Sequence, residues 1–593
     1  MARPIVGGIR VKTENRVQKN GDIYVYERKV MYDPETRTNK TLSRTLLGVK
    51  HPGSDEIQKT RRLLKSKVNA SSTDNTGTRI TTRKKIGLLS LLEWVGEASD
   101  IDSDIRVAFG EDYELASRCI AIARFWVATN GATLPNMRTW QIKHGISSDE
   151  LISESICGTV FEAIGQHENY TQNYFRCRCN GLSRETVIAI DTTTTSTYSS
   201  NLDSARFGYN KDGDKLPTIK KLTLYSPDAN QPIAFYQQPG NIPDVISIRN
   251  ALKELSYLHI EKPLLVGDNG FYSRDNVSAC LLEHMRFIIR VTVRDGVWIR
   301  KAIDEHLSEL ELFNSQLHCE PNTRGITVTL HQEFNYTCKY NTSEHKAGDK
   351  VTFTRRLYLH VYRMHDRHFE DSIQFEKELD SVRKHILQGD PLTPSAQNLA
   401  DQCLEIISGR GGIKVKLNQK GCLEYSRYFG LLIVVSNTEK DREKTLTIYR
   451  KREHIEDHYE KLKNIAEGSK PRVWDDWKFR GRQFVQFVCL GYFDFLYKKL
   501  KDLKLSLGLP NGDELHDLEV NLKEEKKVKS WIENKSLHEI LDWFDCVEQV
   551  NLCGGKHPQV SMITEQVKRD IKFLDVMGYT GKLTGQQFSA NAQ

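Results

Sequence analysis

The chain has 593 residues, of which 38% are hydrophobic and 27% charged, a composition typical of a soluble globular protein. At this length we expect three or four folding units. The first twenty residues lack the apolar stretch of a signal peptide, and no window approaches the roughly 18 apolar residues that span a bilayer. We therefore expect a soluble, cytoplasmic protein, and the net charge of +7 only weakly favours a polyanionic partner.

The first predicted region, residues 1–180, has an extended part and a helical part. Residues 23–33 are predicted to be a strand, and residues 41–49 another. From about residue 59 to residue 168 the pattern is helical, with a long apolar helix beginning near Ile86. We expect this region to be a helical domain that binds DNA, and a helical domain that only packs is the alternative.

Two basic runs in this region are candidate phosphate contacts. The first run comprises Lys59, Arg61, Arg62, Lys65 and Lys67. The second run comprises Arg79, Arg83, Lys84 and Lys85. Cationic runs bind the nucleic-acid backbone, but they are as common on solvated helix faces. The sequence leaves both interpretations open.

Alternating strands and helices occupy the second region, residues 181–296. Strands are predicted at 187–191, 218–226, 232–237, 262–268 and 287–293, and those at 187–191 and 262–268 are predicted to be buried because they are apolar. An amphipathic helix is predicted before the 262–268 strand and a further helix after it. This order of elements predicts a mixed α/β sheet.

The third region, residues 297–427, is predicted to be a β-rich insertion. Alternating apolar residues at 326–330 and 351–361 indicate antiparallel strands, and a charged helix follows them. Residues 428–500 then return to the apolar style of the α/β domain. The last segment, 501–593, is charged and is predicted to be helical, with a role in dimerisation.

Two of the predicted strands each end on an aspartate, Asp191 and Asp268. Residues at the carboxyl ends of central strands point into the crevice where ligands bind. If the two strands are neighbours, these carboxylates can share hard cations through their oxygen atoms. An apolar strand followed by an aspartate is common, so either residue alone is weak evidence for a site.

A charged helix predicted over residues 446–464 supplies a third carboxylate. At about 100° per residue, one narrow stripe of this helix contains Tyr449, Arg452, Glu456, Tyr459 and Lys463. Such a stripe is often only a solvated face. A carboxylate, two cations and two aromatic rings beside a buried edge also suit a site that holds metal and binds phosphates. Glu460 competes with Glu456 for the carboxylate role on geometry alone.

The spacing of four of these residues resembles a known signature. Tyr449, Arg452, Glu456 and Lys463 fit the pattern Y-x2-R-x3-E-x6-K of bacterial insertion-sequence DDE transposases. Further similarity lies in the segments 208–241, 267–292 and 479–493. The resemblance covers about residues 185–500 and implies a ribonuclease-H-like catalytic domain, here an α/β mixed sheet interrupted by the β insertion and flanked by mainly helical regions.

By this resemblance, Asp191, Asp268 and Glu456 are the catalytic metal ligands. They would hold two Mg²⁺ ions, which Mn²⁺ can replace, for hydrolysis at the 3′ end and then strand transfer by the freed 3′-OH. Tyr449, Arg452 and Lys463 would contact DNA. An aromatic residue of the insertion would stack on a flipped base, and the candidates are Trp298, Tyr336, Tyr340 and Tyr358.

The implied function is cut-and-paste DNA transposition. The partners would be double-stranded DNA, as terminal inverted repeats and target, and a second copy of the chain in the synaptic complex. Two alternatives stay open: a ribonuclease-H-like nuclease without strand transfer, and a catalytically inactive, domesticated DNA-binding protein.

Overall fold

The computed structural model divides the chain into two compact units. One consists of residues up to 83 together with 549–564, and the other of residues 84–548 and 565–586. The described residues are 9–19, 21–33, 38–53, 56–58, 79–146, 150–182, 185–199, 201–208, 210, 213–258, 260, 263–338, 341, 345–409, 412–465, 471–507, 518–554, 557–581 and 583. The segment boundaries predicted near residues 180, 296, 427 and 500 remain predictions.

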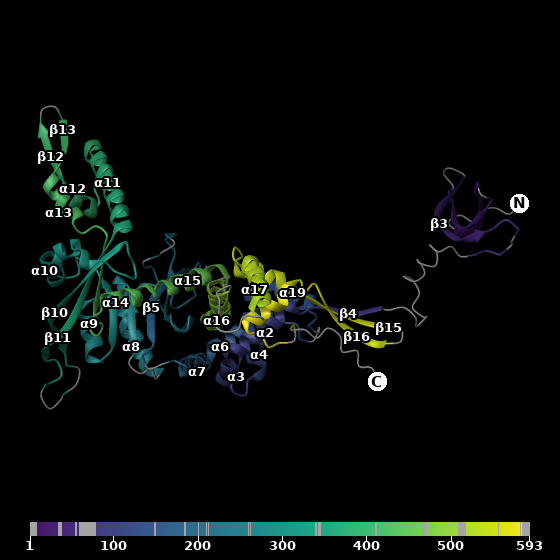
Figure 1. Cartoon of the computed structure of the whole chain (residues 1–593), viewed down its shortest axis with the longest axis horizontal. Coiled ribbons are helices and arrows are strands. Elements are labelled where there is room, and N and C mark those ends of the chain that lie inside the picture. The colour runs from purple at the N-terminus through teal and green to yellow at the C-terminus, as the bar shows by residue number, and fades with distance from the viewer. Residues whose placement is uncertain are drawn as a thin grey trace. The chain divides into compact units, whose positions relative to one another are not determined.

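An eight-stranded mixed sheet organises the larger unit (Figure 1). In spatial order its strands are β10 (Thr323–Thr337), β11 (Lys350–Met364), β14 (Leu431–Ser436), β9 (Arg286–Val291), β8 (Leu264–Gly267), β5 (Val187–Ser196), β6 (Thr218–Ser226) and β7 (Gln231–Pro239). Strand β8 runs parallel to both β5 and β9, and the other neighbours are antiparallel. The predicted mixed α/β sheet is confirmed.

One predicted strand end is wrong. Strand β5 does not stop at Asp191 but continues to Ser196, paired with β6 along its whole second half. The added residues are four threonines and a serine, and β-branched threonine favours the extended backbone. The parallel pairing with β8 does end just before Asp191, at Ile190 opposite Gly267.

The predicted antiparallel strands of the insertion are also present, but they belong to the same sheet. Strands β10 and β11 form a long hairpin, and β11 pairs with β14 from Tyr358 to Arg363. The rest of the segment comprises α11 (His365–Gln388), α12 (Pro394–Cys403), β12 (Leu404–Gly409), β13 (Gly412–Leu417) and α13 (Gln419–Ser426). These elements bury a small core of their own around Leu379, Leu399 and Cys403.

Five helices of the larger unit belong to the sheet region. They are α8 (Asp244–Tyr257), α9 (Arg274–Leu282), α10 (Val297–His306), α14 (Arg442–Arg450) and α15 (Glu453–Ile465). Helix α14 packs on the sheet through Leu446, Ile448 and Tyr449, which share a core with Val266 and Val434. Short 3₁₀ segments lie at Asn269–Phe271, Leu307–Glu311 and Phe313–Ser315.

The single helix predicted over 446–464 is wrong. The chain turns at residues 451–452, between α14 and α15. The backbone N–H of Arg452 bonds to the Tyr449 carbonyl, and the N–H of Ile455 bonds to the Arg452 carbonyl. These tighter i to i−3 bonds replace the regular helical ones, so the angular positions of a straight helix do not carry across the turn.

Seven α-helices and one 3₁₀ turn form a helical layer beside the sheet region. They are α2 (Gly87–Ala98), α3 (Ile101–Phe109), α4 (Tyr113–Thr129), α5 (Met137–Lys143), α6 (Glu154–Gln166), α7 (Glu168–Asn180), α16 (Asp476–Ser506) and the turn Leu134–Asn136. Helix α16 is buried around much of its circumference. Its close approach to α6 needs glycine, because a Cβ on Gly481 would lie 1.9 Å from the Phe161 carbonyl oxygen.

The C-terminal region is only partly helical, contrary to the prediction. It contains α17 (Leu518–Ile532), α18 (Leu537–Asp545) and α19 (Lys568–Met577), but also β15 (Glu548–Gly554) and β16 (His557–Thr564). These strands form a sheet with β4 (Arg79–Lys85), in the order β16, β15, β4. The second basic run therefore lies on a strand rather than on a helix.

A separate three-stranded sheet belongs to the smaller unit. Strands β1 (Ile9–Val17), β2 (Ile23–Asp33) and β3 (Thr38–Lys50) form an antiparallel meander, which confirms the predicted strands at 23–33 and 41–49. Nearly all β1 side chains are exposed.

Among the helices that the structure describes, none has the length and apolar character of a membrane-spanning segment.

Candidate active site

Asp191 on β5 and Asp268, the residue directly after β8, lie at neighbouring positions of the larger sheet. Ile190 on β5 is the register partner of Gly267 on β8, so the two aspartates are the next residues on adjacent strands. Neighbouring parallel residues at the same register project to the same face of a sheet. The structure therefore brings together the two carboxylates that the sequence singled out.

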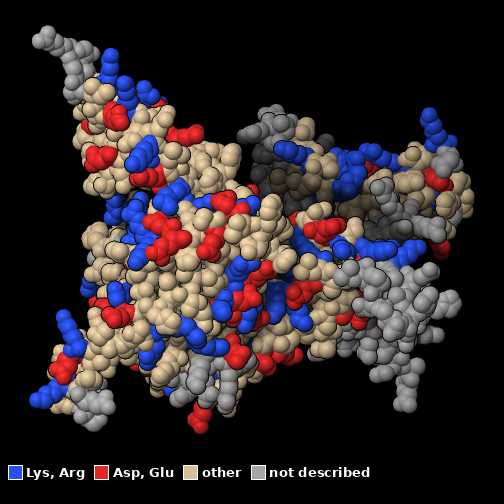
Figure 2. All heavy atoms as spheres, turned by 60° about the vertical axis from the view of Figure 1, so that its left-hand side comes forward, with Lys and Arg blue, Asp and Glu red and all other residues tan. Residues whose placement is uncertain are grey.

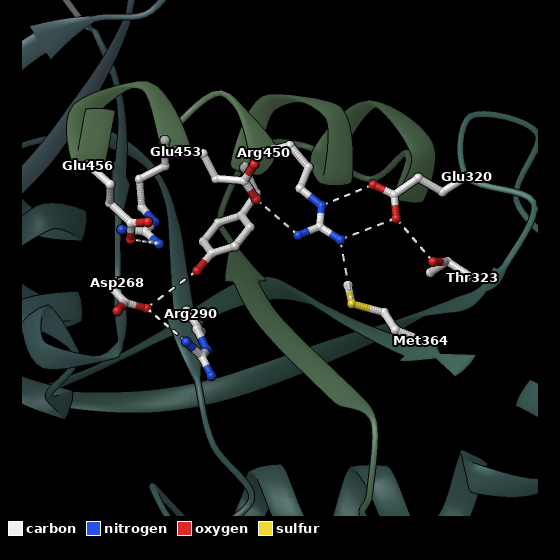
Figure 3. Close-up of polar contacts among 10 residues, drawn as sticks. Asp268, Arg290, Glu320, Thr323, Met364, Arg450, Glu453 and Glu456 are labelled. Atoms are coloured by element: carbon white, nitrogen blue, oxygen red, sulfur yellow. Dashed lines mark hydrogen bonds and ion pairs between the residues drawn. The ribbon is translucent and has the colours of Figure 1, made fainter. Parts of the chain in front are cut away.

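Asp268 has two side-chain partners, one from the sheet and one from helix α14. Nη1 of Arg290, on the next strand β9, donates to Oδ1 of Asp268 at 3.3 Å. The Tyr449 hydroxyl donates to the same oxygen at 3.3 Å. Figure 3 shows Asp268 and Arg290 below helix α15, which carries Glu456.

Helix α15 and the turn before it supply the opposite wall. Nη2 of Arg452 donates to Oε1 of Glu456 at 2.8 Å. The Tyr459 hydroxyl donates to the backbone carbonyl of Asp191 at 2.7 Å. Four of the five predicted stripe residues thus have described side chains on this wall, although the straight-helix geometry behind the prediction is wrong. The side chains of Lys463 and of its neighbour Glu460 lie outside the described ones.

The electrostatics of the site centre on the Arg452 guanidinium. Burial alone raises the pKa of Asp268, but Arg452, the Asn269 amide and Arg290 outweigh it and hold that pKa below its ordinary value. Burial lowers the pKa of Arg452, and the charges of Tyr449, Asp268, Glu456 and Asp191 raise it above its ordinary value. Asp268 is therefore ionised at neutral pH, and Arg452 lies within electrostatic reach of all three candidate carboxylates.

Three ion pairs lie at the turn that carries Arg452. Arg450 binds Glu320 through Nε at 2.9 Å and Nη2 at 3.3 Å, and it also reaches Glu453 at 3.1 Å (Figure 3). Lys451 binds Asp228 at 2.6 Å. The paired guanidinium of Arg450 and the paired ammonium of Lys451 restrict the backbone where the turn begins. This restriction positions Tyr449 and Arg452 toward the aspartates.

A buried carboxylate on helix α16 positions helix α15. Asp494 is fully buried and binds Nζ of Lys461 at 2.7 Å and Nδ1 of His458 at 3.2 Å. The sequence analysis identified neither Asp494 nor Arg290. For Asp494 a signal was available, because it is a lone charge inside an apolar segment and a buried charge needs a partner.

The residues present match the donor chemistry of a hard divalent cation. Carboxylate oxygens are the ligands that Mg²⁺ prefers, and Asp191 and Asp268 present them from adjacent strands. Among the described side chains, however, no three His, Cys, Asp or Glu residues are grouped closely enough to hold a metal. Glu456 is bound to Arg452 in this structure. Metal binding by all three carboxylates thus requires Glu456 to exchange this partner.

The other predicted contacts are dispersed. Lys59, Arg61, Arg62 and Lys65 lie outside the described residues, as does Tyr340. Arg83 and Lys84 are exposed on β4. On the face drawn in Figure 2, Lys and Arg are interspersed with Asp and Glu rather than gathered in one field. The net charge alone therefore does not locate a DNA-binding surface.

The candidate stacking residues have unequal access. Tyr358 is buried within the sheet, on β11 opposite Ser436 of β14. Tyr336 contacts the Phe353 ring edge-on toward the end of the β10–β11 hairpin. Trp298 is half-buried on α10 and hydrogen-bonds Tyr272, four residues after Asp268. Of the three described candidates, Tyr358 is the least available to a base.

Comparison with known proteins agrees with this geometry. Residues 182–474 match the family model described as the transposase DDE domain, a segment just under half of the chain that contains both aspartates and Glu456. The match supports a DDE transposase. No curated protein matches the chain.

One solved structure shows a weak likeness. It is the cryo-EM structure of the piggyBac transposase synaptic complex with hairpin DNA, at 9% identity and a TM-score of 0.33. The alignment covers 77% of this chain and 81% of that chain. A TM-score this low carries no conclusion about the present chain.

Proposed function

We propose that the chain is a bacterial insertion-sequence DNA transposase that moves its element by cut and paste. The observation that carries the proposal is the pair Asp191 and Asp268 on neighbouring chain segments, faced by Tyr449 of α14, Arg452 of the turn and Glu456 of α15. Strands β7, β6 and β5 are mutually antiparallel neighbours and β5, β8 and β9 are parallel neighbours, an order that supports a ribonuclease-H-like catalytic domain. The substrate would be double-stranded DNA at the inverted repeats and at the target.

In this proposal Asp191, Asp268 and Glu456 hold Mg²⁺, or Mn²⁺ in its place. Bound metal would acidify a water molecule and stabilise the leaving 3′ oxygen, which are the needs of 3′-end hydrolysis and of strand transfer. Asp268 is suited to this role because its lowered pKa keeps it ionised. Ionised carboxylates bind hard cations without first losing a proton.

Arg452 would bind a carboxylate before DNA is present and a DNA phosphate afterwards. In the structure its Nη2 binds Glu456, while its Nε is buried without a hydrogen-bond partner. A buried, unsatisfied guanidinium N–H is a ready donor for a phosphate oxygen. We propose that Arg452 moves from Glu456 to the DNA backbone when DNA and metal bind, and that Lys463 of α15 assists.

The test compares the wild type with Glu456→Gln on labelled duplexes that carry the ends of the source element. We expect Mg²⁺-dependent cleavage by the wild type and none by the variant, with equal DNA binding in a gel shift. Glu460→Gln is the matched control, one helical turn further along α15, and should cleave like the wild type.

The other outcomes separate the alternatives. Cleavage that survives Glu456→Gln but is lost in Glu460→Gln would reassign the third ligand. Hydrolysis without strand-transfer products would indicate a ribonuclease-H-like nuclease. Binding without cleavage by any form of the protein would indicate an inactive DNA-binding descendant.

A further inference from the structure

One face of the sheet formed by β1, β2 and β3 carries a row of cations that runs across all three strands. Lys12 on β1 is the register partner of Arg28 on β2, and Arg28 is the register partner of Arg44 on β3. Lys12 and Arg44 are exposed, and Arg28 is half-buried. We call these three residues the basic row.

Further cations flank the basic row on the same face. Side chains alternate along a strand, so Arg10, Glu14 and Arg16 share the face of Lys12. Glu14 is the single carboxylate that these alternate β1 positions contribute. It contacts Arg16 at 2.9 Å, Arg44 at 2.9 Å and Arg28 at 3.8 Å. Five cations therefore share one acid on this face.

The opposite face of the same sheet has lysines without such a row. Lys29 lies opposite Ser43, Lys40 opposite Met31, and Lys50 opposite Ile23. No two of these lysines are register partners. In the described strands the opposite face thus has three cations against five on the face of the basic row, and its three cations are not aligned.

Aligned like charges lower the stability of the sheet, and a bound anion removes this destabilisation. Like charges directly opposite one another destabilise a sheet, and one carboxylate cannot neutralise the whole face. Adjacent strands lie about 4.8 Å apart, so the basic row spans about 10 Å between the outer strands. This span is close to the roughly 12 Å width of the DNA major groove, whose rims are lined with phosphates.

We infer that the face of the basic row is a docking surface for double-stranded DNA. Lys12, Arg28 and Arg44 contact backbone phosphates, and Arg10 and Arg16 extend the contact along β1. Charge complementarity favours a polyanion, and the choice of duplex DNA among polyanions rests on the proposed function. Such contacts are independent of sequence and add to the affinity of the chain for any duplex.

The experiment uses the full chain, a fluorescent 30-base-pair duplex of mixed sequence, and anisotropy titrations over a range of salt concentrations. The row variant combines Lys12→Gln, Arg28→Gln and Arg44→Gln. The matched control combines Lys29→Gln, Lys40→Gln and Lys50→Gln on the opposite face of the same sheet, with the same change in net charge. Circular dichroism checks that both variants fold.

We expect the row variant to bind more weakly and its slope of log affinity against log salt to fall by about 3, one for each lost phosphate contact. The control should stay close to the wild type. Equal losses in both variants would overturn the assignment to this face, because they would reflect net charge alone. Tighter binding of duplex RNA than of duplex DNA would overturn the choice of partner.

Cleavage by the wild type separates this inference from the proposed function. An unchanged slope in the row variant, beside normal wild-type cleavage, would overturn the docking surface and leave the transposase proposal intact. A wild type that binds duplex DNA with the expected row dependence but never cleaves would support the docking surface and contradict the catalytic proposal. Absence of any DNA binding by the wild type would contradict both.

Discussion

The eight-stranded sheet and the sheet of β1, β2 and β3 differ in whether their charged side chains are buried or exposed. In the larger sheet every residue of β6 is buried, including Lys220 and Lys221. Lys220 binds Asp244 at 2.7 Å, whereas burial lowers the pKa of Lys221 to about 7. In the three-stranded sheet, Lys12 and Arg44 stay exposed.

The comparison shows how burial determines what a charge can do. A charge inside the larger unit must be paired or must shift its pKa, because desolvation is costly. Each such charge therefore depends on its own specific partners, as Asp268 and Arg452 do. Exposed charges keep their hydration, so only their number and alignment produce a field that a distant polyanion senses. The predictions below test this difference from the largest expected effect on stability to the smallest.

Removal of Asp494 should have the largest effect. Asp494→Ala leaves Lys461 and His458 without their shared buried partner, which we expect to lower the free energy of unfolding by about 3–5 kcal/mol. Urea denaturation measures the change. Asp502→Ala is the control on the same helix, at an exposed position, and should change stability by about 0.5 kcal/mol or less. A loss at Asp494 no larger than at Asp502 would contradict the importance of the buried pair.

Acid should destabilise the larger sheet through His360. Burial on β11 lowers the pKa of His360 to about 4, against an ordinary value near 6.5. Between these values the unfolded chain binds a proton that the folded chain does not, so stability falls as pH falls, by about 3 kcal/mol over the window. His360→Gln should remove this part of the dependence in urea titrations from pH 7 to pH 4. His331→Gln, at an exposed position on β10, should leave it.

The smallest stability change should come from the basic row. The row variant loses three exposed or half-exposed charges, so we expect a change of about 0.5 kcal/mol or less per substitution. The sign should be stabilising at low salt, because like charges no longer oppose one another. It should fade at 0.5 M salt, where screening is stronger. A large loss of stability in thermal melts would show that the row has a structural role instead.

Much of the fold was predictable from local patterns. Apolar runs predicted the buried strand β8 and the first half of β5, because a strand that is buried on both faces has no polar alternation. Strands β6 and β7 were predicted from the turn-type residues between them. The predicted end of β5 at Asp191 was wrong because an apolar run indicates which residues are buried and does not show where the extended backbone ends. The polar threonines that follow Asp191 are also part of the strand. The strand β4 and its pairing with β15 were missed, since no local pattern links residues so far apart in sequence.

The candidate site was predictable in its residues but not in its geometry. The spacing of Tyr449, Arg452 and Glu456 pointed to one shared wall. The turn at residues 451–452 depends on Arg450 meeting Glu320 and on Lys451 meeting Asp228, which are contacts between distant segments. A helical wheel contains no such information.

The sequence by itself determined which residues carry charge, which runs are apolar and which spacings repeat. It therefore determined the candidate carboxylates Asp191, Asp268 and Glu456 and the mixed α/β character of the chain. Tertiary structure alone decided that β5 and β8 are parallel neighbours, that Arg452 lies within reach of all three carboxylates, and that Lys12, Arg28 and Arg44 align in one row. The physical reason is that pairing register and burial arise from contacts between segments far apart along the chain.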